Sequence, residues 1–266
     1  MGIVRSKKRL GQNFLVSQEI IAKIVDAISP RPNDTIVEIG AGKGELTVPL
    51  AKSGATIFAV EFDLQLCHYL EKALKNQKNV TVLQKDFLKF IPAEYGLSSF
   101  KLCGNLPFNI TSPVIEWIVH HRAMVKKAVI MIQKEVALRL ASKPGGKEWS
   151  PLAILTQLYF DIHILFNVAP QHFKPSPEVT SSVVELTPKE EVEIAHFQQF
   201  EELVRSSFKQ RRKQLINNLV PAIIPSVKAA EEIFRQLGFQ RSIRGEEIDT
   251  PQFFELTELL VKHNML

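Results

Sequence analysis

The segment Asn105-Leu106-Pro107-Phe108 places an amide, a rigid residue and an aromatic ring side by side at the end of an apolar run. The side-chain oxygen of Asn105 and the carbonyl of Leu106 can accept hydrogen bonds from an amino group. Pro107 stiffens the turn so that these acceptors point outward, and Phe108 offers a face on which a flipped-out base can stack. This order of residues indicates a site that orients the exocyclic amino group of adenine, with an ordinary turn and a core Phe as the alternative.

A glycine-rich loop at residues 37–47 ends an earlier apolar run and contains Gly40, Gly42 and Gly44. Such glycines let the backbone approach a ligand at the carboxyl end of a strand. A dinucleotide fingerprint would need a small residue at position 45, where this chain has Glu45. A P-loop would end in Gly-Lys followed by Ser or Thr, and that ending is missing here. Negative charge from Glu38 and Glu45 suits a cationic sulfonium better than a pyrophosphate, which favours S-adenosylmethionine as the cofactor.

Two further acids stand at the ends of the next expected strands. Glu61 closes one strand, where a carboxylate can accept hydrogen bonds from both ribose hydroxyls, and Asp86 follows the next, where it can accept from an adenine amino group. Each acid alone is more often a surface residue at a strand end. Acids at three successive strand ends together indicate a cofactor site.

The amino group of adenine is a weak nucleophile because its lone pair is delocalised into the ring. No strong base is needed to activate it, since its proton becomes acidic once the nitrogen carries the transferred methyl group. The cofactor would supply the electrophile and the protein the orientation. Phe173, before Pro175 and Pro177 in a stiff loop, can close the other face of the base, with a loop-packing Phe as the alternative.

Short β-branched or apolar runs alternate with helical periodicity along most of the chain. This alternation predicts βαβ units and a mostly parallel sheet with helices on both faces, with an antiparallel final pair of strands. The fold class is therefore α/β, and together with the S-adenosylmethionine site indicated above we expect a Rossmann-like class I methyltransferase domain. The expected strands are residues 35–39, 56–61, 80–84, 100–104, 128–133, 162–168 and 182–187, and the expected helices are residues 17–28, 46–52, 64–76, 112–121, 135–141 and 151–159.

Strand signals stop after Pro188, and only helical periodicity remains to Leu266. We therefore expect a methyltransferase domain at residues 1–188, with a basic N-terminal arm, and a small all-α domain at residues 189–266. The segment at residues 143–149, "KPGGKEW", is expected to form a surface loop, with a lid as the alternative.

The chain of 266 residues is 45% hydrophobic and 23% charged, which is typical of a globular protein and argues against disorder. Cys67 and Cys103 are too few and too far apart for a disulfide framework or a zinc site, so we expect no metal and a reducing compartment. No apolar run reaches the roughly 20 residues of a membrane span. We expect a cytoplasmic protein without membrane contact.

The net charge is +5, and the basic residues gather in two clusters. The second cluster lies in a stretch whose apolar spacing predicts a helix. Two basic clusters flanking a folded body favour a polyanionic partner, with solvated surfaces as the alternative. The candidate RNA-binding residues are Arg5, Lys7, Lys8 and Arg9 in the arm, and Lys209, Arg211, Arg212 and Lys213 in the second cluster.

Eight motifs give the chain a resemblance to a known family over nearly its whole length. They read "KKRLGQNFL", "EIGAGKGELT", "VEFD", "KDFL", "GNLPFNI", "FKPSPEVTSSVV", "RSSFKQRRKQLINNL" and "RGEEID". With these motifs the chain resembles the rRNA adenine N6-dimethyltransferases, most closely their bacterial small-subunit type. Many members carry Tyr where this chain has Phe108, a change that preserves stacking but removes a hydroxyl.

The resemblance implies transfer of four methyl groups from S-adenosylmethionine to two adjacent adenosines in the 3′-terminal hairpin loop of small-subunit (16S) rRNA. The partner would be the pre-30S particle, docked by the C-terminal domain of a monomer. The target base would lie between Asn105, Leu106, Pro107 and Phe108 on one side and Phe173 on the other. The cofactor site would comprise Asn13, Leu15, Gly40, Glu61, Asp86 and Asn105, with Gln12 and Gly42 beside them.

Three other functions remain open at this stage. A large-subunit rRNA adenine methylase of the macrolide-resistance type shares the chemistry and differs in its target. A DNA adenine methyltransferase would usually have Pro where this chain has Leu106. A mainly non-catalytic ribosome assembly factor could retain the fold, although intact Glu61, Asp86 and Asn105 argue against lost catalysis.

Overall fold

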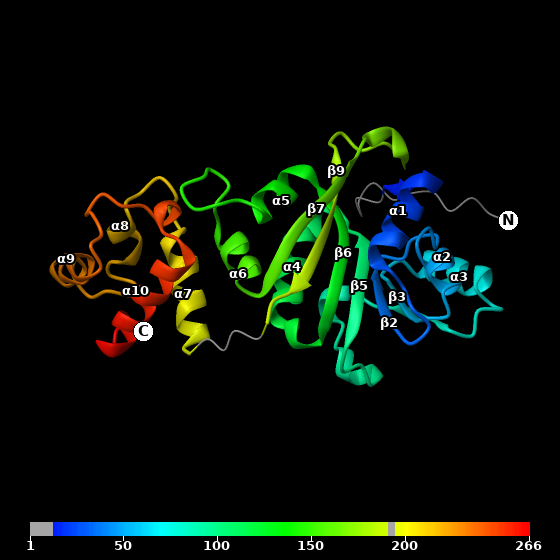
Figure 1. The fold of residues 1–266 in the computed structure, drawn as a ribbon, viewed down its shortest axis with the longest axis horizontal. Coiled ribbons are helices and arrows are strands. Elements are labelled where there is room, and N and C mark those ends of the chain that lie inside the picture. The colour runs from blue at the N-terminus through cyan, green and yellow to red at the C-terminus, as the bar shows by residue number, and fades with distance from the viewer. Residues whose placement is uncertain (1–12, 191–194) are drawn as a thin grey trace. The chain divides into compact units, whose positions relative to one another are not determined.

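The computed structural model describes residues 13–190 and 195–266 (Figure 1). The chain forms two compact units, one of Met1–Ala137 and Phe160–Lys189, the other of Leu138–Tyr159 and Glu190–Leu266. This division differs from the single boundary that we expected after residue 188. The reason is that residues 143–149 contact the segment just before the last helix: Trp149 is buried and its Nε1 donates to the Ile248 carbonyl at 2.9 Å.

The first unit is built on a seven-stranded sheet in the order β4-β3-β2-β5-β6-β9-β7. Five strands run parallel, and β9 pairs antiparallel with both β6 and β7, as expected for the final pair. β2, β3 and β4 have the predicted bounds, and the other four strands are longer than predicted. The strands are β2 (Thr35–Ile39), β3 (Thr56–Glu61), β4 (Val80–Gln84), β5 (Phe100–Asn105), β6 (Val125–Gln133), β7 (Phe160–Val168) and β9 (Ser181–Pro188).

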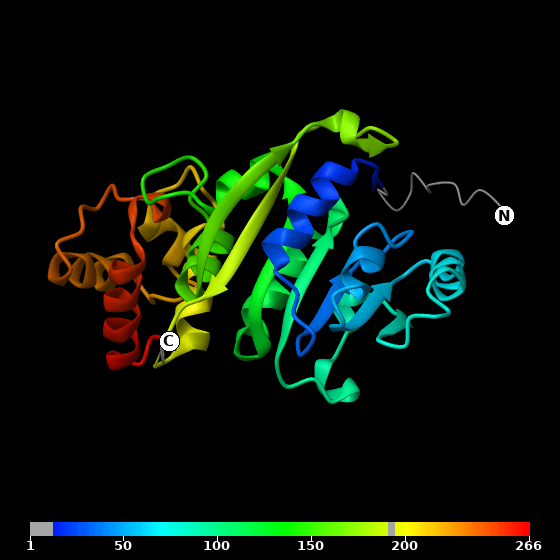
Figure 2. The ribbon, with the colours of Figure 1, turned by 45° about the vertical axis from the view of Figure 1, so that its right-hand side comes forward.

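Helices connect the parallel strands and confirm the expected Rossmann-like architecture. The longest helix before β7, α1 (Gln18–Ile28), comes before β2, the first strand of this sheet, and lies along the sheet (Figure 2). Its start is fixed by Ser17, whose Oγ accepts the Ile20 N–H at 3.5 Å, and its isoleucines at helical spacing are buried in the core. The other helices before β7 are α2 (Thr47–Ala51), α3 (Leu64–Ala73), α4 (Thr111–His120), α5 (Lys134–Leu140) and α6 (Pro151–Tyr159).

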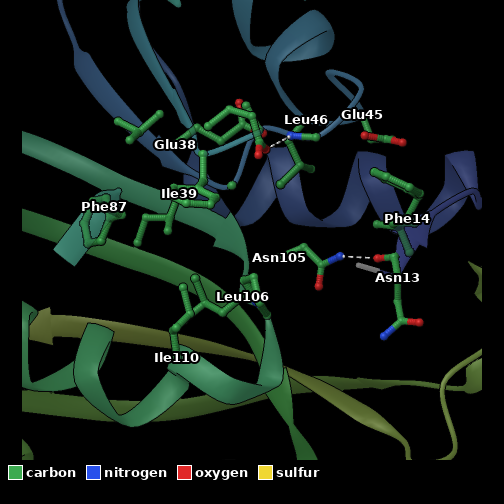
Figure 3. Close-up of a pocket in the computed structure, with 18 of the residues that line it drawn as sticks. Asn13, Phe14, Glu38, Ile39, Glu45, Leu46, Phe87, Asn105, Leu106 and Ile110 are labelled. Carbon is green, nitrogen blue, oxygen red and sulfur yellow. Dashed lines mark hydrogen bonds between the residues drawn. The ribbon is translucent and has the colours of Figure 1, made fainter. Parts of the chain in front are cut away.

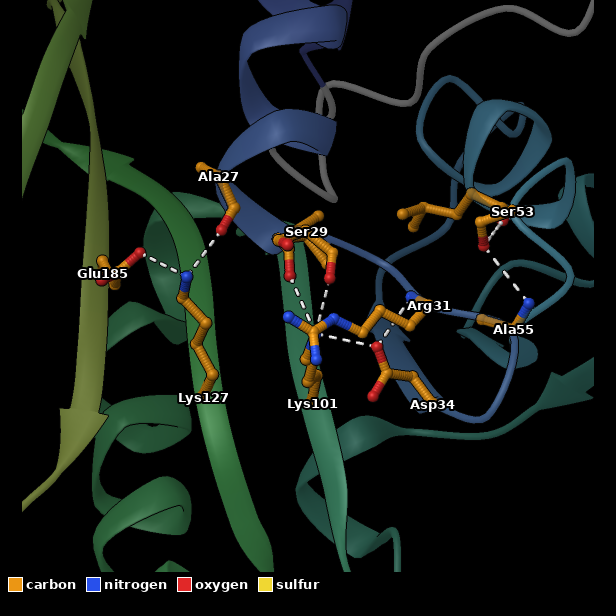
Figure 4. Close-up of polar contacts among 11 residues, drawn as sticks. Ala27, Ser29, Arg31, Asp34, Ser53, Ala55, Lys101, Lys127 and Glu185 are labelled. Atoms are coloured by element: carbon orange, nitrogen blue, oxygen red, sulfur yellow. Dashed lines mark hydrogen bonds and ion pairs between the residues drawn. The ribbon is translucent and has the colours of Figure 1, made fainter.

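Two lysines from neighbouring strands hold the carboxyl end of α1 (Figure 4). Lys101 Nζ donates to the carbonyls of Ile28 at 3.2 Å and Ser29 at 2.6 Å, and also to Asp34 Oδ2 at 2.8 Å. Lys127 Nζ donates to the Ala27 carbonyl at 2.7 Å. These ammonium groups satisfy carbonyls that lack partners within the helix and complement its dipole.

A second, two-stranded sheet joins two segments that are far apart in the sequence. β1 (Phe14–Leu15) pairs antiparallel with β8 (Phe173–Lys174), and Leu15 lies opposite Phe173. Neither strand was predicted, because two residues are too few to show a period.

The second unit contains α6 and the C-terminal helices. We expected Lys209 to Lys213 on a helix, but α7 ends at Ser207 and the basic residues form a turn. The side chain of Asn218 stabilises this turn, since its Nδ2 donates to the Ser207 carbonyl at 2.8 Å and its Oδ1 accepts from the Gln210 N–H at 3.1 Å. The helices after residue 195 are α7 (Phe197–Ser207), α8 (Leu215–Leu219), α9 (Val227–Gln236) and α10 (Thr250–Lys262).

In the described part of the chain, every helix is too short or too polar to cross a membrane.

Candidate active site

One pocket of the first unit contains nearly all of the predicted cofactor and base residues (Figure 3). It lies at the carboxyl ends of β2, β3 and β5, where a parallel sheet of this kind binds ligands. The expected residues in its lining are Asn13, Leu15, Gly40, Gly42, Glu61, Asp86, Asn105, Leu106, Pro107, Phe108 and Phe173.

The glycine loop forms one wall of the pocket in a backbone conformation that requires glycine. Gly40 has φ 66° and Gly42 has φ 59°, both in the left-handed region. The Gly40 N–H donates to the Val60 carbonyl at 2.8 Å, which fixes the loop against β3. A Cβ atom on Gly42 would lie 3.2 Å from a Glu45 carboxylate oxygen, so a side chain there would crowd the pocket.

Glu61 presents its carboxylate to the pocket from the end of β3 while remaining only 6% exposed. Its Oε2 accepts the Gly42 N–H at 2.9 Å, and its Oε1 accepts the Asp63 N–H at 2.8 Å. Because a carboxylate has about four acceptor positions, each oxygen keeps one for a ligand hydroxyl. Burial raises the pKa of Glu61, and the backbone donors partly oppose that rise.

Two more carboxyl groups line the same pocket. Glu38 is buried at the end of β2, and its Oε2 accepts the Thr47 hydroxyl at 2.6 Å. Burial raises the pKa of Glu38 to about 8, with further contributions from Glu45 and Glu61. Burial also raises the pKa of Glu45, whose Oε2 accepts the Lys43 N–H at 3.0 Å. With a pKa of about 8, Glu38 is largely protonated near pH 7, so the negative charge of the lining comes from the other carboxyl groups.

Asp86 follows β4 and belongs to the lining with its neighbours Lys85 and Phe87. Its Oδ1 caps the short helical turn that follows by accepting the Leu88 N–H at 3.1 Å. Lys85 pairs with Glu94 at 2.6 Å, so its positive charge is partly neutralised.

The turn after β5 is held by hydrogen bonds on both sides. Asn105 Nδ2 donates to the Asn13 carbonyl at 2.8 Å, and the Leu106 N–H donates to the Met131 carbonyl at 3.0 Å. The Pro107 carbonyl accepts the Ile110 N–H at 3.1 Å, which closes a short helical turn over Phe108–Ile110. Phe108 is half-buried and Phe173 is buried in the lining of the same pocket.

The remaining predicted residues lie elsewhere. Gln12 and the basic-arm residues Arg5, Lys7, Lys8 and Arg9 lie outside the described residues. The other basic cluster belongs to the second unit, where Lys209, Arg211, Arg212 and Lys213 are exposed.

Sequence reasoning missed several aromatic and basic residues of the lining. They are neighbours of predicted residues: Phe14 stands between Asn13 and Leu15, Phe62 follows Glu61, and Lys85 and Phe87 flank Asp86. Their position beside a strand-end acid or within the N-terminal motif was the available signal. Phe62 is 61% exposed although it is a large apolar residue, which fits a place at the rim of the pocket.

The lining fits S-adenosylmethionine rather than a nucleotide phosphate. Glu61 has acceptor positions for ribose hydroxyls, Asp86 has acceptors for an amino group, and the nearby carboxyl groups favour a positively charged sulfur. Among the residues that the structure describes, no group of three or more His, Cys, Asp or Glu side chains is arranged to hold a metal ion.

Comparison with known proteins agrees with this geometry. The family model for ribosomal RNA adenine dimethylase matches residues 3–252. Ribosomal RNA small subunit methyltransferase A of Syntrophus aciditrophicus is 40% identical over 97% of this chain and 95% of that protein. The protein of the same name from Xylella fastidiosa strain Temecula1 is 35% identical over 94% of each chain.

Solved structures show the same fold. A dimethyladenosine transferase from Plasmodium falciparum superposes with a TM-score of 0.81 at 26% identity, covering 94% of this chain and 98% of that one. The 23S rRNA methyltransferase ErmE gives a TM-score of 0.70, also at 26% identity, over 94% of this chain and 100% of that one. The fold is that of class I methyltransferases, with S-adenosylmethionine as methyl donor, and the chain belongs to the ribosomal RNA adenine dimethylase family.

Proposed function

We propose that the protein dimethylates N6 of two adjacent adenosines in the 3′-terminal hairpin loop of small-subunit rRNA. The observation that carries this proposal is the convergence of the Asn105 to Phe108 turn with Glu61 and the glycine loop in one pocket. The names of the two curated relatives, which act on the small subunit, support this choice of target.

The chain contributes acceptors and orientation to the reaction. When bound, S-adenosylmethionine supplies an electrophilic methyl group on a positively charged sulfur. Asn105 Oδ1 and the Leu106 carbonyl accept hydrogen bonds from the adenine amino group, so its lone pair faces that methyl group. Bound there, the cofactor would supply its methyl carbon to the nitrogen, its sulfur would keep the electron pair of the broken carbon–sulfur bond, and the methylated nitrogen would lose its proton to water.

Two aromatic rings hold the flipped base. Phe108 comes from the turn after β5 and Phe173 from β8, and both line the pocket. Stacking on aromatic rings contributes about 1–3 kcal/mol per base, which helps to offset the cost of unstacking it from the RNA. Phe108 stacks without the hydroxyl that Tyr would bring, so the hydrogen bonds to the amino group come from Asn105 and Leu106.

The second unit and the basic arm serve to dock the pre-30S particle. The exposed basic turn after α7 supplies positive charge for the phosphate backbone. We further propose that the protein is cytoplasmic, as its particle substrate is, and that it acts as a monomer.

A methylation assay tests the target. The protein is incubated with radiolabelled S-adenosylmethionine and unmethylated small-subunit particles, large-subunit particles or naked rRNA, and primer extension maps the label. We expect dimethyladenosine at two adjacent positions near the small-subunit 3′ end. Label on large-subunit rRNA would contradict the proposed target and favour the resistance type of methylase.

Asn105→Ala is the matched variant for the assay. We expect its turnover to fall by orders of magnitude while particle binding remains nearly intact, because the change removes an acceptor in the pocket and no docking residue. A near-normal rate would contradict the role of Asn105. Intact cofactor binding without label on any RNA would instead favour a non-catalytic assembly factor.

A further inference from the structure

The segment at residues 13–16 contacts both halves of the proposed site. Asn13, Phe14 and Leu15 line the cofactor side of the pocket, and the Asn13 carbonyl accepts the Asn105 amide. Leu15 pairs with Phe173 across the β1–β8 sheet. The Val16 N–H donates to the His172 carbonyl at 2.8 Å, which extends this pairing by one residue.

The hydrogen bond between Asn13 and Asn105 fixes which end of the amide faces the target. A backbone carbonyl only accepts hydrogen bonds, so the nitrogen of the Asn105 amide must face it, as Figure 3 shows. Asn105 Oδ1 is therefore the atom of the amide that does not face Asn13, and no donor among the described residues forms a hydrogen bond to it. The reversed amide would present a donor to the amino group of adenine, which is itself a donor.

β1 is also attached to the glycine loop. The Phe14 ring is buried, and Lys43 Nζ lies 4.5 Å from the ring centroid, within the range of a cation–π interaction. A Cβ atom on Gly42 would lie 3.4 Å from Phe14 Cε1, so ring and loop are close neighbours. A ligand that orders the glycine loop therefore also acts on β1.

We propose that residues 13–16 form a positioning element that couples the cofactor side of the pocket to the target-base side. A cofactor that contacts Asn13 to Leu15 holds β1 in place, and β1 then fixes the Asn105 amide through the Asn13 carbonyl and Phe173 through strand pairing. This inference rests on the proposed function and deepens it. Coupling between two binding sites is reciprocal, so the target must also tighten cofactor binding.

The first test measures the coupling in the unaltered protein. The dissociation constant of unmethylated small-subunit particles is measured with and without saturating S-adenosylhomocysteine, which fills the cofactor pocket without turnover. The constant for S-adenosylhomocysteine is then measured with and without particles. We expect each ligand to lower the dissociation constant of the other by the same factor, about five-fold or more. Equal affinities in both comparisons would overturn the proposal.

The second test asks whether the coupling passes through β1. Val16→Pro removes the N–H that bonds to His172, and Val16→Ala is the matched control because the Val16 side chain is 43% exposed. We expect the alanine variant to retain the coupling. In the proline variant the coupling factor should approach one. Its single-turnover rate of methyl transfer should fall even when S-adenosylmethionine and particles are both saturating. Full coupling in a folded proline variant would overturn the proposal.

A spectroscopic measurement covers the case in which Val16→Pro does not fold. In the unaltered protein, the side-chain amide protons of Asn105 should exchange slowly with solvent, and more slowly with S-adenosylhomocysteine bound. Unchanged exchange on binding would contradict the coupling. The proposed function and this inference can fail independently. If the two ligands are coupled but small-subunit rRNA is not methylated, only the proposed function is contradicted. If small-subunit rRNA is methylated but the ligands are not coupled, only this inference is contradicted.

Discussion

The Thr47 hydroxyl donates to Glu38 Oε2 at 2.6 Å inside the wall of the pocket. Burial raises the pKa of Glu38 from 4.5 to about 8, and this hydrogen bond opposes part of the rise. Between about pH 4.5 and pH 8, Glu38 is therefore largely protonated in the folded protein and largely ionised in the unfolded chain. The protein's free energy of unfolding should fall as the pH rises through this window, by up to about 1.4 kcal/mol per pH unit.

Glu38→Gln tests this titration, because Gln keeps an acceptor for Thr47 and has no proton to lose. We expect the free energy of unfolding of the variant to decline less between pH 5 and pH 8 than that of the unaltered protein, as measured by urea denaturation. Thr47→Val removes the hydroxyl and should move the window to higher pH. Parallel curves for all three proteins would contradict the raised pKa.

Glu61→Gln should weaken cofactor binding although it changes few atoms. Both carboxylate oxygens accept backbone N–H groups, so the amide nitrogen of Gln must oppose one of these donors and turn away. We expect the dissociation constant of S-adenosylhomocysteine to rise by about 10- to 100-fold in calorimetric titration, since a hydrogen bond to a charged group contributes roughly 1.5–3 kcal/mol. Glu71→Gln, an exposed position outside the pocket lining, is the control. An unchanged titration would reject the ribose contact.

The sequence predicted the sheet well because its strands are short apolar or β-branched runs between turn residues. Thr35–Ile39, Thr56–Glu61 and Val80–Gln84 have the bounds that the pattern indicates. The strand-end rule also placed Glu61, Asp86 and Asn105 at one edge of the sheet, where the structure brings them together.

Other features depend on contacts that no local pattern carries. The pairing of Leu15 with Phe173 joins segments far apart in the chain, so β1 and β8 could not be predicted from periodicity. Trp149 belongs to the second unit because its Nε1 bonds to Ile248. The basic residues after α7 form a turn because the Asn218 side chain forms hydrogen bonds with the backbone of that turn. The apolar spacing on either side is helical, so the sequence pattern did not reveal the turn.

Lys101→Met should destabilise the first unit. The side chain of Lys101 is 14% exposed and donates to two carbonyls at the end of α1 and to Asp34. Met retains the apolar stem and removes the ammonium donor that these acceptors share, so we expect a loss of about 1–3 kcal/mol in the free energy of unfolding by urea denaturation. Lys126→Met, at an exposed position on β6, is the control. Equal effects of the two substitutions would contradict the role of Lys101.

The free energy of unfolding that Lys101→Met loses should also depend on pH. Burial raises the pKa of Asp34, but the hydrogen bond from Lys101 and other donors outweighs it, and the net pKa is lowered from 3.8. A lowered folded-state pKa stabilises the protein above the unfolded value, and this stabilisation is lost as the pH falls through the folded value. The difference between Lys101→Met and the unaltered protein should therefore shrink in acid. A constant difference would show that the carbonyl contacts account for the whole effect.

The four basic residues of the turn after α7 should not contribute equally to RNA binding. Arg211 Nε pairs with Glu246 at 2.9 Å, and its guanidinium also donates to the Lys147 carbonyl, so this side chain is already engaged within its own unit. Arg212 and Lys213 are exposed and form no ion pair with any residue that the structure describes. Their charge is therefore available for phosphate groups.

Replacing Arg212 and Lys213 together by Ala should weaken binding of small-subunit particles and flatten its salt dependence. A plot of log affinity against log salt concentration should lose about 0.7–0.9 in slope for each phosphate contact removed. Arg211→Ala should change this slope less and instead lower the melting temperature, because it frees Glu246 and the loop at residues 143–149. If Arg211→Ala flattened the slope and the double variant did not, the engaged arginine would be the RNA contact and the exposed pair only a solvated surface.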